Sequence, residues 1–199
     1  MKRLGILLSG RGSNFVAIAD SIAAGRLDAE IAVVISNRAD AAGAAAARER
    51  GLEVVVLPFE GMAREAHDAQ LAARLDQARV DLICLAGYMR LLSAPLIRRY
   101  PLRVLNIHPS LLPAFPGLHA HQDALAHGVK VSGCTVHFVD EGIDSGPIIQ
   151  QAAVAVLDGD TEESLSARIL KEEHRIYSEA IALVLSGKYR IEGRRVVRV

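Results

Sequence analysis

An amide and an imidazole lie two residues apart where an apolar run ends, in the segment Asn106-Ile107-His108-Pro109. Alternate side chains of a strand share a face, so Asn106 and His108 point the same way, and Pro109 cannot extend the strand ladder. An amide donor beside a protonated imidazole suits the oxyanion of a tetrahedral intermediate. Because catalytic residues of open α/β sheets gather at the carboxyl ends of strands, we expect the chemistry at this point.

A carboxylate that would assist this pair is Asp144, in the turn Ile143-Asp144-Ser145-Gly146-Pro147. If the strands flanking this turn lie beside the main sheet, Asp144 can reach His108, orient its ring and help to move protons. Acyl transfer to an amine requires such a set of groups. Alternatively, Asp144 is a turn-forming aspartate without a catalytic part.

Covalent and metal-dependent chemistry have less support in the sequence. Cys84 and Cys134 lie within apolar runs, and no Gly-x-Ser-x-Gly elbow marks a nucleophilic serine. His119 and His121 have the spacing of a metal pair, with His137 as an imaginable third ligand, but no fourth ligand or supporting acid is evident. We therefore expect no metal, and we expect hydrogen bonds around a proline-rich loop to account for these histidines.

The glycine-rich loop of residues 9–14, Ser-Gly-Arg-Gly-Ser-Asn, stands between the first apolar run and the first helical pattern. Backbone N–H groups and a helix dipole bind phosphate in this setting, although an ordinary tight turn has a similar composition. A dinucleotide fits less well, because Phe15 replaces the third small residue and residues 36–38, Ser-Asn-Arg, supply no acid for a ribose. The serine and arginine of that segment leave an NADP-dependent reductase as a second hypothesis. Arg64 would either add a charge to the phosphate site or lie in solvent.

Two polar residues, Glu173 and His174, lie on the apolar stripes of the long C-terminal helical pattern. Polar groups among apolar neighbours need partners. They are either core residues with satisfied hydrogen bonds or contacts for a bound molecule, and for His174 we favour the core.

Short apolar runs alternate with alanine-rich helical patterns over the first half of the chain. The runs cover residues 4–8, 31–35, 54–57, 82–86 and 104–107. The helical patterns cover residues 14–24, 39–50, 62–79 and 94–100, and His67 and His127 look like exposed helix residues. Strands buried on both faces with helices between them predict an α/β fold with a doubly wound, mostly parallel sheet of Rossmann-like type.

The pattern changes in the C-terminal half, where a loop rich in proline and glycine precedes two further segments. These cover residues 131–139 and 148–156. They predict an added strand pair. The capping-box spacing of Asp160 and Glu163 predicts the start of a long helix that Gly187 stops, and residues 189–199 predict a small hairpin.

The chain has 199 residues, of which 51% are hydrophobic, enough for one sizeable core. Its 23 basic and 23 acidic side chains cancel, so no overall charge attracts it to nucleic acid or a membrane surface. Two cysteines in apolar runs fit a reducing compartment, and polar residues interrupt the N-terminus before a secretory or membrane segment is complete. We expect a single cytoplasmic domain that binds small molecules, not nucleic acid or membrane, as a monomer or weak homodimer.

Together these segments closely resemble the phosphoribosylglycinamide formyltransferases, the folate-dependent formyltransferases of purine synthesis. The resemblance runs nearly end to end and rests on residues 8–14, 36–38, 63–66, 85–89, 106–113, 119, 121, 134–139, 144–149 and 173–174. It departs from the family at Leu8, where a glycine is usual, and this puts the path of the glycine-rich loop in question.

The resemblance implies that the amine of glycinamide ribonucleotide attacks the formyl carbon of the co-substrate 10-formyltetrahydrofolate, without a metal. Asn106 and His108 would stabilise the oxyanion, while Asp144 would pair with His108 and help to move the amine proton. The residues implied for the ribotide are Arg11, Gly12, Ser13, Asn14, Arg64, Gly87, Pro109 and Glu173. Those implied for the folate are Met89, Arg90, Leu91, Leu92, Ile97, Val139, Asp140, Glu141, Gly142 and Asp144. Residues 1–199 would be one formyltransferase domain, with ribotide phosphate bound by the N-terminal half and folate by the C-terminal half.

Two other members of the superfamily share parts of this pattern. A formyltetrahydrofolate hydrolase would use a similar trio with water as the acceptor, and a formyltransferase acting on initiator transfer RNA shares the proline-rich loop. The hydrolase carries an extra N-terminal domain and the RNA-directed enzyme an added C-terminal one, so we expect neither for a chain with these ends. The NADP-dependent oxidoreductase is the hypothesis from another reaction class.

Overall fold

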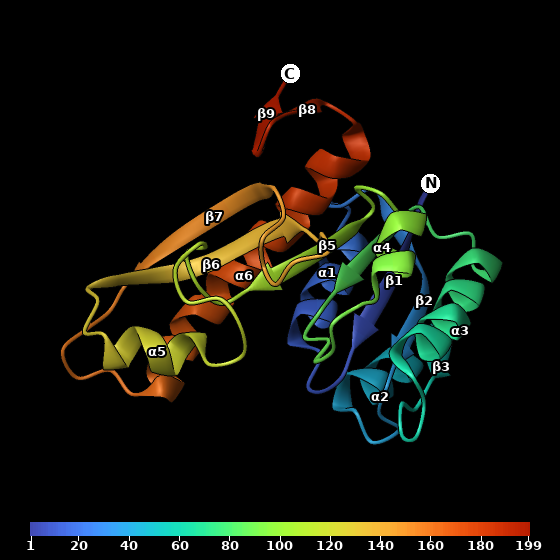
Figure 1. Ribbon diagram of the computed structural model, residues 1–199, viewed down its shortest axis with the longest axis horizontal. Helices are drawn as coiled ribbons and strands as arrows, with labels where there is room; N and C mark the ends of the chain where they lie inside the picture. Colours follow the sequence, from blue (N-terminus) through green and yellow to red (C-terminus); the bar gives the residue numbers. More distant parts are fainter. The chain divides into compact units, whose positions relative to one another are not determined.

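The computed structural model describes residues 1–199, which form two compact units, Met1–Asn106 and Ile107–Val199 (Figure 1). Each unit has its own strands and helices. None of the helices is both long and apolar enough to cross a membrane. The expectation that the whole chain works as a single domain stays a prediction.

The first unit is built on parallel strands formed by the apolar runs. These are β1 (Lys2–Leu8), β2 (Ala29–Ser36), β3 (Val54–Val56), β4 (Leu82–Leu85) and β5 (Val104–His108), whose last two residues begin the second unit. Their order is β3-β2-β1-β4-β5, with every neighbouring pair parallel. Near-continuous runs of Val, Ile and Leu form such strands because helices cover both faces. The predicted parallel α/β fold is confirmed.

Four helices connect these strands. They are α1 (Ser13–Ala23), α2 (Ala42–Glu49), α3 (Arg64–Gln77) and α4 (Ala94–Arg99). Helix α1 packs against α2, and α3 packs against α4, as expected when right-handed crossovers run first one way from β1 and then the other (Figure 1). The chain adds β2 and β3 on one side of β1 and then β4 and β5 on its other side, so the direction of the strand order reverses between β1 and β4. The loops after these two strands therefore flank the switch point, where sheets of this kind bind ligands.

The second unit is built on an antiparallel pair, β6 (Val131–Phe138) and β7 (Ile148–Ala155), which confirms the predicted strand pair. The long helix α6 (Glu162–Ser186) packs against both strands through its buried apolar stripe (Figure 1). A C-terminal hairpin of β8 (Tyr189–Glu192) and β9 (Arg195–Arg198) pairs with β7 through β9. This hairpin also agrees with the prediction.

Helix α6 begins with a different cap from the one predicted. Thr161 is the N-cap, and Thr161 and Ser164 form the reciprocal capping box. Asp160 instead accepts hydrogen bonds from the Leu157 N–H and from Arg168, which together hold the pKa of its carboxyl group below the usual range. At the other end, Gly187 stops the helix with φ +66°, as predicted.

One short helix, α5 (Ala120–Ala126), follows the proline-rich loop, where only His127, its C-terminal cap, was expected to be helical. It has two buried alanines and follows the proline-rich segment, so no extended apolar stripe marks it in the sequence.

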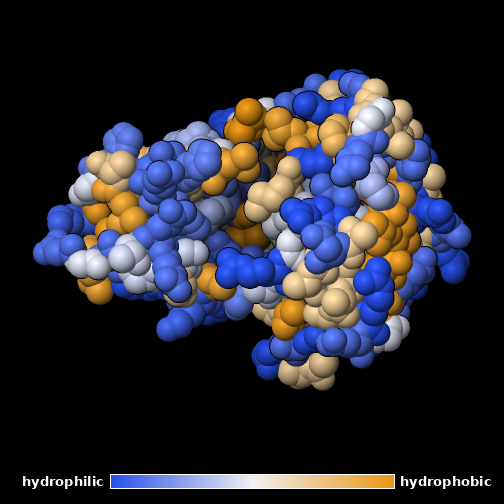
Figure 2. Space-filling model, turned by 90° about the horizontal axis from the view of Figure 1, so that it is seen from below, coloured by the Kyte–Doolittle hydropathy of each residue, from blue (hydrophilic) through white to orange (hydrophobic).

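On the face of the molecule drawn in Figure 2, hydrophilic and hydrophobic side chains are interspersed.

Candidate active site

The glycine-rich loop ends on Gly12, which caps the N-terminus of α1. Gly12 has φ +72°, in the left-handed region that favours glycine. A Cβ atom on Gly12 would lie 2.6 Å from the Cα atom of Gly43, and the Gly43 N–H donates to the Gly10 carbonyl oxygen at 3.0 Å. Glycine at both positions lets the start of α2 approach the loop closely. The N-terminal end of α1 therefore presents its first-turn N–H groups in a fixed loop, an arrangement that suits phosphate.

Leu8, where the family usually has glycine, is compatible with the path of the glycine-rich loop. It is fully buried at the end of β1, and its Cδ2 atom would lie 2.9 Å from a Cβ atom on Gly43. The leucine side chain thus fills the space beside Gly12 and Gly43. The loop reaches the start of α2 with leucine at this position.

The loop after β1 is tied to the loop after β4 through Ser9. The Ser9 N–H donates to the Gly87 carbonyl oxygen at 3.1 Å, and the Ser9 hydroxyl accepts from the Met89 N–H at 2.9 Å. Gly87 itself has φ +74°. Segments expected to bind the ribotide and the folate therefore meet at the switch point of the first unit.

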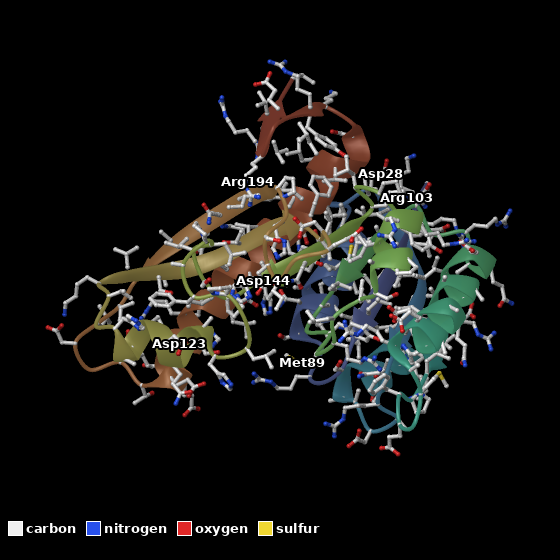
Figure 3. All side chains as sticks on the ribbon, viewed as in Figure 1. Asp28, Met89, Arg103, Asp123, Asp144 and Arg194 are labelled. Atoms are coloured by element: carbon white, nitrogen blue, oxygen red, sulfur yellow. The ribbon has the colours of Figure 1, made fainter.

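The segment after β4 presents both apolar and charged side chains. Met89 and Leu91 are 66% and 49% exposed, whereas Leu92 is buried (Figure 3 labels Met89). Two large exposed apolar side chains within three residues offer apolar surface to an aromatic ligand. Ile97, on α4, is half-buried.

Arg64, expected beside the phosphate, is exposed at the start of α3. Burial lowers the pKa of Arg90, and the positive charge of Arg64 adds to that lowering against the opposing effects of Tyr88 and Asp68. The structure therefore places the charge of Arg64 within range of Arg90, a residue expected to bind folate. Its assignment to the ribotide phosphate stays a prediction.

The imidazole of His108 lies at the end of β5 and is almost fully buried. Its Nε2 atom is 2.9 Å from the carbonyl oxygen of Phe115, and its Nδ1 atom is 3.4 Å from Oδ2 of Asp144. Because a carbonyl oxygen only accepts, Nε2 is the donor to Phe115. Asn106 lies two residues earlier in the same strand and is half-buried. The expected approach of Asp144 to His108 is present.

Asp144 is held in place from several sides in the turn between β6 and β7 (Figure 3). Its Oδ2 atom accepts from the Gly117 N–H at 2.9 Å, and its Oδ1 atom is 3.7 Å from Nε2 of His137. Its φ of +48° is a conformation that aspartate and asparagine adopt more readily than most residues. The carboxylate is thus fixed between two imidazoles and a backbone donor.

His137 is buried, and its Nδ1 atom lies 2.8 Å from the carbonyl oxygen of Phe138. Burial lowers its pKa, against smaller opposing effects of the Phe138 carbonyl and Asp144. The Nδ1 atom must carry the proton in order to donate to a carbonyl. His137 therefore presents Nε2 to Asp144.

The proline-rich loop that carries Phe115 is anchored to the strands of the second unit. The hydroxyl of Thr135 donates to the Ser110 carbonyl oxygen at 2.7 Å and accepts from the Leu112 N–H at 3.0 Å. Gln151 donates to the Leu112 carbonyl oxygen and to Thr135, both at 2.9 Å. Pro109 is half-buried at the start of this loop, and the Leu112–Pro113 peptide bond is cis.

The turn expected to contact folate, from Val139 to Asp144, is ordered by Asp140. Its Oδ1 atom accepts from the Gly142 N–H at 3.1 Å and from the Ser145 hydroxyl at 2.6 Å. Glu141 and Gly142 are exposed and Val139 is half-buried. The side chain of Asp140 is thus engaged in shaping the turn, which leaves neighbouring backbone groups to meet a ligand.

Glu173 and His174 lie on α6 with different surroundings. Glu173 is 7% exposed, and burial followed by the negative charge of Glu173 raises the pKa of the Cys134 thiol to about 12. Burial lowers the pKa of His174, whose Nε2 atom is buried and makes no hydrogen bond within the protein.

Both cysteines are free and buried, and no group of three or more acidic, histidine or cysteine residues could hold a metal ion.

The two residues that suggested NADP, Ser36 and Arg38, both make local contacts. The Ser36 hydroxyl donates to the carbonyl oxygen of Arg38 at 2.8 Å, and the Arg38 guanidinium pairs with Asp40 at 2.9 Å. A neighbouring carboxylate opposes binding of the phosphate that distinguishes NADP. The structure therefore gives the reductase hypothesis no free cationic site here.

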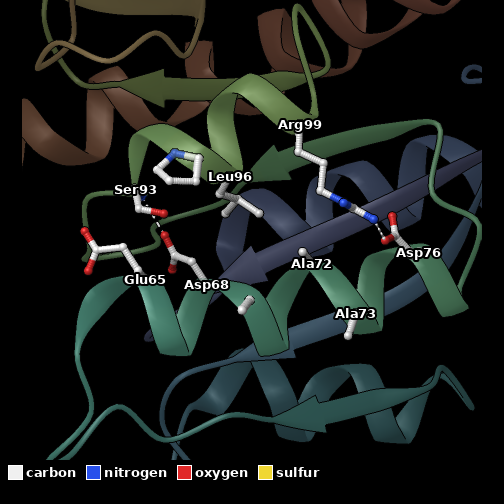
Figure 4. A pocket seen from close by; sticks show the side chains of 10 residues that line it. Glu65, Asp68, Ala72, Ala73, Asp76, Ser93, Leu96 and Arg99 are labelled. Carbon is white, nitrogen blue, oxygen red and sulfur yellow. Dashed lines mark hydrogen bonds and ion pairs between the residues drawn. The ribbon is translucent and has the colours of Figure 1, made fainter.

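A pocket of about 360 Å³ lies between α3 and α4, and its lining includes none of the residues expected to bind or react (Figure 4). Glu65 and Asp68 border one part of it, and an ion pair between Asp76 and Arg99 borders another. Its floor includes small alanine side chains. It therefore does not coincide with the expected site.

Sequence reasoning missed three partners of the expected catalytic residues and misplaced one histidine. Phe115 and Gly117 act through backbone groups, which have no sequence signature, and His137 was considered as a metal ligand or a hydrogen-bonding residue near the proline-rich loop but not as a neighbour of Asp144. His67 was expected to be exposed but is 1% exposed, so that prediction is wrong. Its polar neighbours in sequence concealed a buried contact with the segment before α3.

Residues 2–181 match the family model described as Formyl transferase. The chain is 41% identical to the phosphoribosylglycinamide formyltransferase of Escherichia coli strain K12, with 94% of this chain and 88% of that protein covered. It is 49% identical to the trifunctional purine biosynthetic protein adenosine-3 of Drosophila melanogaster but spans only 14% of its length. A solved structure of glycinamide ribonucleotide transformylase 1 from Symbiobacterium toebii superposes with a TM-score of 0.98 at 57% identity, covering 100% of this chain and 94% of that one.

Proposed function

The chain belongs to the formyl transferase family, and from that premise we propose that it transfers a formyl group from 10-formyltetrahydrofolate to the amine of 5'-phosphoribosylglycinamide in purine synthesis. The relatives named as phosphoribosylglycinamide formyltransferases support this assignment. Because the chain spans a small part of the trifunctional relatives, the proposal concerns this one transfer reaction.

Phosphate binding falls to the glycine-rich loop in this proposal. The backbone at Gly12 and Ser13 faces the phosphate from the N-terminus of α1, and Arg11 adds a charge. The fixed approach of Gly12 to Gly43 supports the idea of a preformed loop. Asn14, Arg64, Gly87, Pro109 and Glu173 complete the proposed ribotide set.

Folate binding falls to the segment from Met89 to Leu92 with Ile97, and to the turn from Val139 to Asp144. The exposed apolar side chains of Met89 and Leu91 favour an aromatic ring. The turn, ordered by Asp140, offers backbone groups to the edge of a pterin. Glu141 and Gly142 complete this set.

The chemistry falls to Asn106, His108 and Asp144. The amine nitrogen forms a bond to the formyl carbon, the carbonyl oxygen becomes an oxyanion, and the bond from that carbon to N10 of the folate then breaks. Asn106 and His108 donate hydrogen bonds to the oxyanion. Asp144 pairs with the imidazolium of His108 and helps to pass the amine proton to the departing N10.

The observation that carries this proposal is the position of Asp144, with Oδ2 at 3.4 Å from Nδ1 of His108 and 2.9 Å from the Gly117 nitrogen. With Nδ1 directed at the carboxylate, Nε2 is the nitrogen that can serve an oxyanion. It now donates to Phe115. The formyl oxygen would therefore replace the Phe115 carbonyl oxygen as acceptor during the reaction.

The substrates proposed are small molecules, and we propose a cytoplasmic monomer or weak homodimer that binds neither nucleic acid nor membrane. The balance of 23 basic and 23 acidic side chains supports the part of this proposal that concerns nucleic acid and membrane.

A steady-state assay with glycinamide ribonucleotide and a 10-formyl folate, followed by folate absorbance, tests the activity. We expect folate release that depends on the ribotide and yields the formylated amine. Release of formate at the same rate without ribotide would instead support the hydrolase. A fluorescence titration in which micromolar NADPH binds would favour the oxidoreductase, and we expect no such binding.

A further inference from the structure

Phe59 lies in the connection between β3 and α3, and its side chain is 38% exposed. The guanidinium carbon of Arg90 stands over its ring, 3.0 Å from the centroid. The ring of His67 packs on Phe59 edge to face, with centroids 5.8 Å apart and an interplanar angle of 83°. Phe59 is thus a layer between a guanidinium and a buried imidazole.

His67 is fixed by two further contacts. Its Nε2 atom donates to the carbonyl oxygen of Leu57 at 3.0 Å, and its Nδ1 atom is 3.4 Å from Oδ1 of Asp68. His67 and Asp68 are 1% and 3% exposed, so both are held away from solvent. A buried ring with both nitrogens engaged is a rigid support for the side chain packed against it.

Asp68 links this support back to the segment that carries Arg90. Its Oδ2 atom accepts from the Ser93 N–H at 2.5 Å, as Figure 4 shows. Two sets of contacts therefore join the segment after β4 to the region around the start of α3. Arg90 stacks on Phe59 in the connection before α3, and Ser93 donates to Asp68 in the first turns of α3. Arg90 cannot move freely without losing its stacking contact with Phe59.

The guanidinium of Arg90 is held with donors unused. Its Nη1 atom is buried and makes no hydrogen bond within the protein. A buried donor without an acceptor is unfavourable by itself, so the arrangement gains from an acceptor supplied by a ligand. An arginine side chain is long and flexible, and fixing it before the ligand arrives removes part of the entropic penalty of binding.

We propose that Phe59 is a positioning residue for Arg90, with His67 and Asp68 as its support, and that it sets the affinity for the folate co-substrate. The proposal rests on the folate-binding role of Arg90 given above. Stacking on the ring fixes the plane of the guanidinium, and the plane decides where its N–H groups point. Phe59 itself need not touch either substrate.

The test compares Phe59→Leu, which keeps an apolar side chain, with Phe59→Tyr, which keeps the ring. In the steady-state assay, Phe59→Leu should raise the KM for the 10-formyl folate about five- to twentyfold, while kcat and the KM for glycinamide ribonucleotide change less than twofold. Phe59→Tyr should keep the folate KM within twofold of the wild-type value. Thermal unfolding of each variant checks that the fold is kept.

A double-mutant cycle with Arg90→Ala separates positioning from a general structural role. In the Arg90→Ala background, Phe59→Leu should raise the folate KM by less than twofold further. A full additional increase would overturn the proposal, as would an unchanged folate KM in Phe59→Leu or a parallel rise in both KM values. If Phe59→Leu does not fold, Arg90→Lys takes its place, because it keeps the charge and loses the planar stack; an unchanged folate KM would then overturn the proposal.

The same assay keeps the two proposals apart. A wild-type protein without ribotide-dependent transfer would contradict the proposed function. An active wild type with an unaltered Phe59→Leu variant would contradict only the positioning role.

Discussion

Asn106 and His108 could be found from sequence because their relation is local. Two residues apart in one strand, they share a face whatever the rest of the fold does, and His108 indeed ends β5. The partners of His108 could not be found this way. Phe115 and Gly117 contribute a carbonyl oxygen and an N–H, which every residue type has, and only the folded loop brings them to His108 and Asp144.

Replacing Asn106 by alanine should lower kcat by about two to three orders of magnitude, the usual effect of removing one oxyanion donor. The measurement is the steady-state transfer rate at saturating substrates. A fall of less than tenfold would show that Asn106 does not stabilise the oxyanion.

The resemblance to the formyltransferases implies that Glu173 holds the ribose hydroxyls, and its carboxylate stands on an otherwise apolar face of α6. We expect Glu173→Gln to weaken ribotide binding about ten- to hundredfold, since a hydrogen bond to a charged group contributes about 1.5–3 kcal/mol. Isothermal titration with glycinamide ribonucleotide measures this change. Unaltered affinity would return Glu173 to a purely structural role in the core.

Whole elements were predicted where one physical pattern dominates. The parallel strands follow from apolar runs that need cover on both faces, and the C-terminal hairpin from its turn residues. The bounds of helix α5 were missed, although His127 was expected to be helical, because a short helix with two buried alanines leaves no periodic stripe. The cap of α6 was misplaced because Asp160 and Thr161 are both good caps by type, and the hydrogen bonds of Arg168 decide between them.

The glycine-rich loop is an element whose shape depends on one residue. Gly12→Ala should destabilise the protein by at least about 1 kcal/mol, because a left-handed conformation is unfavourable for alanine and its Cβ would meet Gly43. The KM for glycinamide ribonucleotide should rise with it. Urea unfolding and steady-state kinetics measure the two effects.

Gly10→Ala is the matched control in the same loop, since a Cβ atom there meets nothing within 4 Å. It should reduce stability much less than Gly12→Ala. Equal losses for the two variants would mean that the close approach to Gly43 does not govern the loop.

At the scale of the whole molecule, buried and half-buried histidines make stability depend on pH. Burial lowers the pKa of His121, His137 and His174 below the value near 6.5 of an unfolded chain. The unfolded state therefore binds more protons between the folded and unfolded pKa values. The free energy of unfolding should therefore be at its full value above about pH 7 and should decrease as the pH drops below 6.5.

Urea unfolding between pH 8 and pH 5 measures this dependence. His137→Asn should flatten the decline, and replacement of the exposed His127 by asparagine is the control. A wild-type protein that gains stability as the pH falls through this window would contradict the account.

The central claim is that Asp144 acts on the reaction through His108, and the rate of formyl transfer by Asp144→Asn tests it most directly. Asparagine suits the φ of +48° and can still accept from the Gly117 N–H, so the variant removes the charge and keeps the turn. We expect kcat to fall by about two to four orders of magnitude, the range for loss of a positioned acid–base group. A kcat within tenfold of the wild type would contradict the claim.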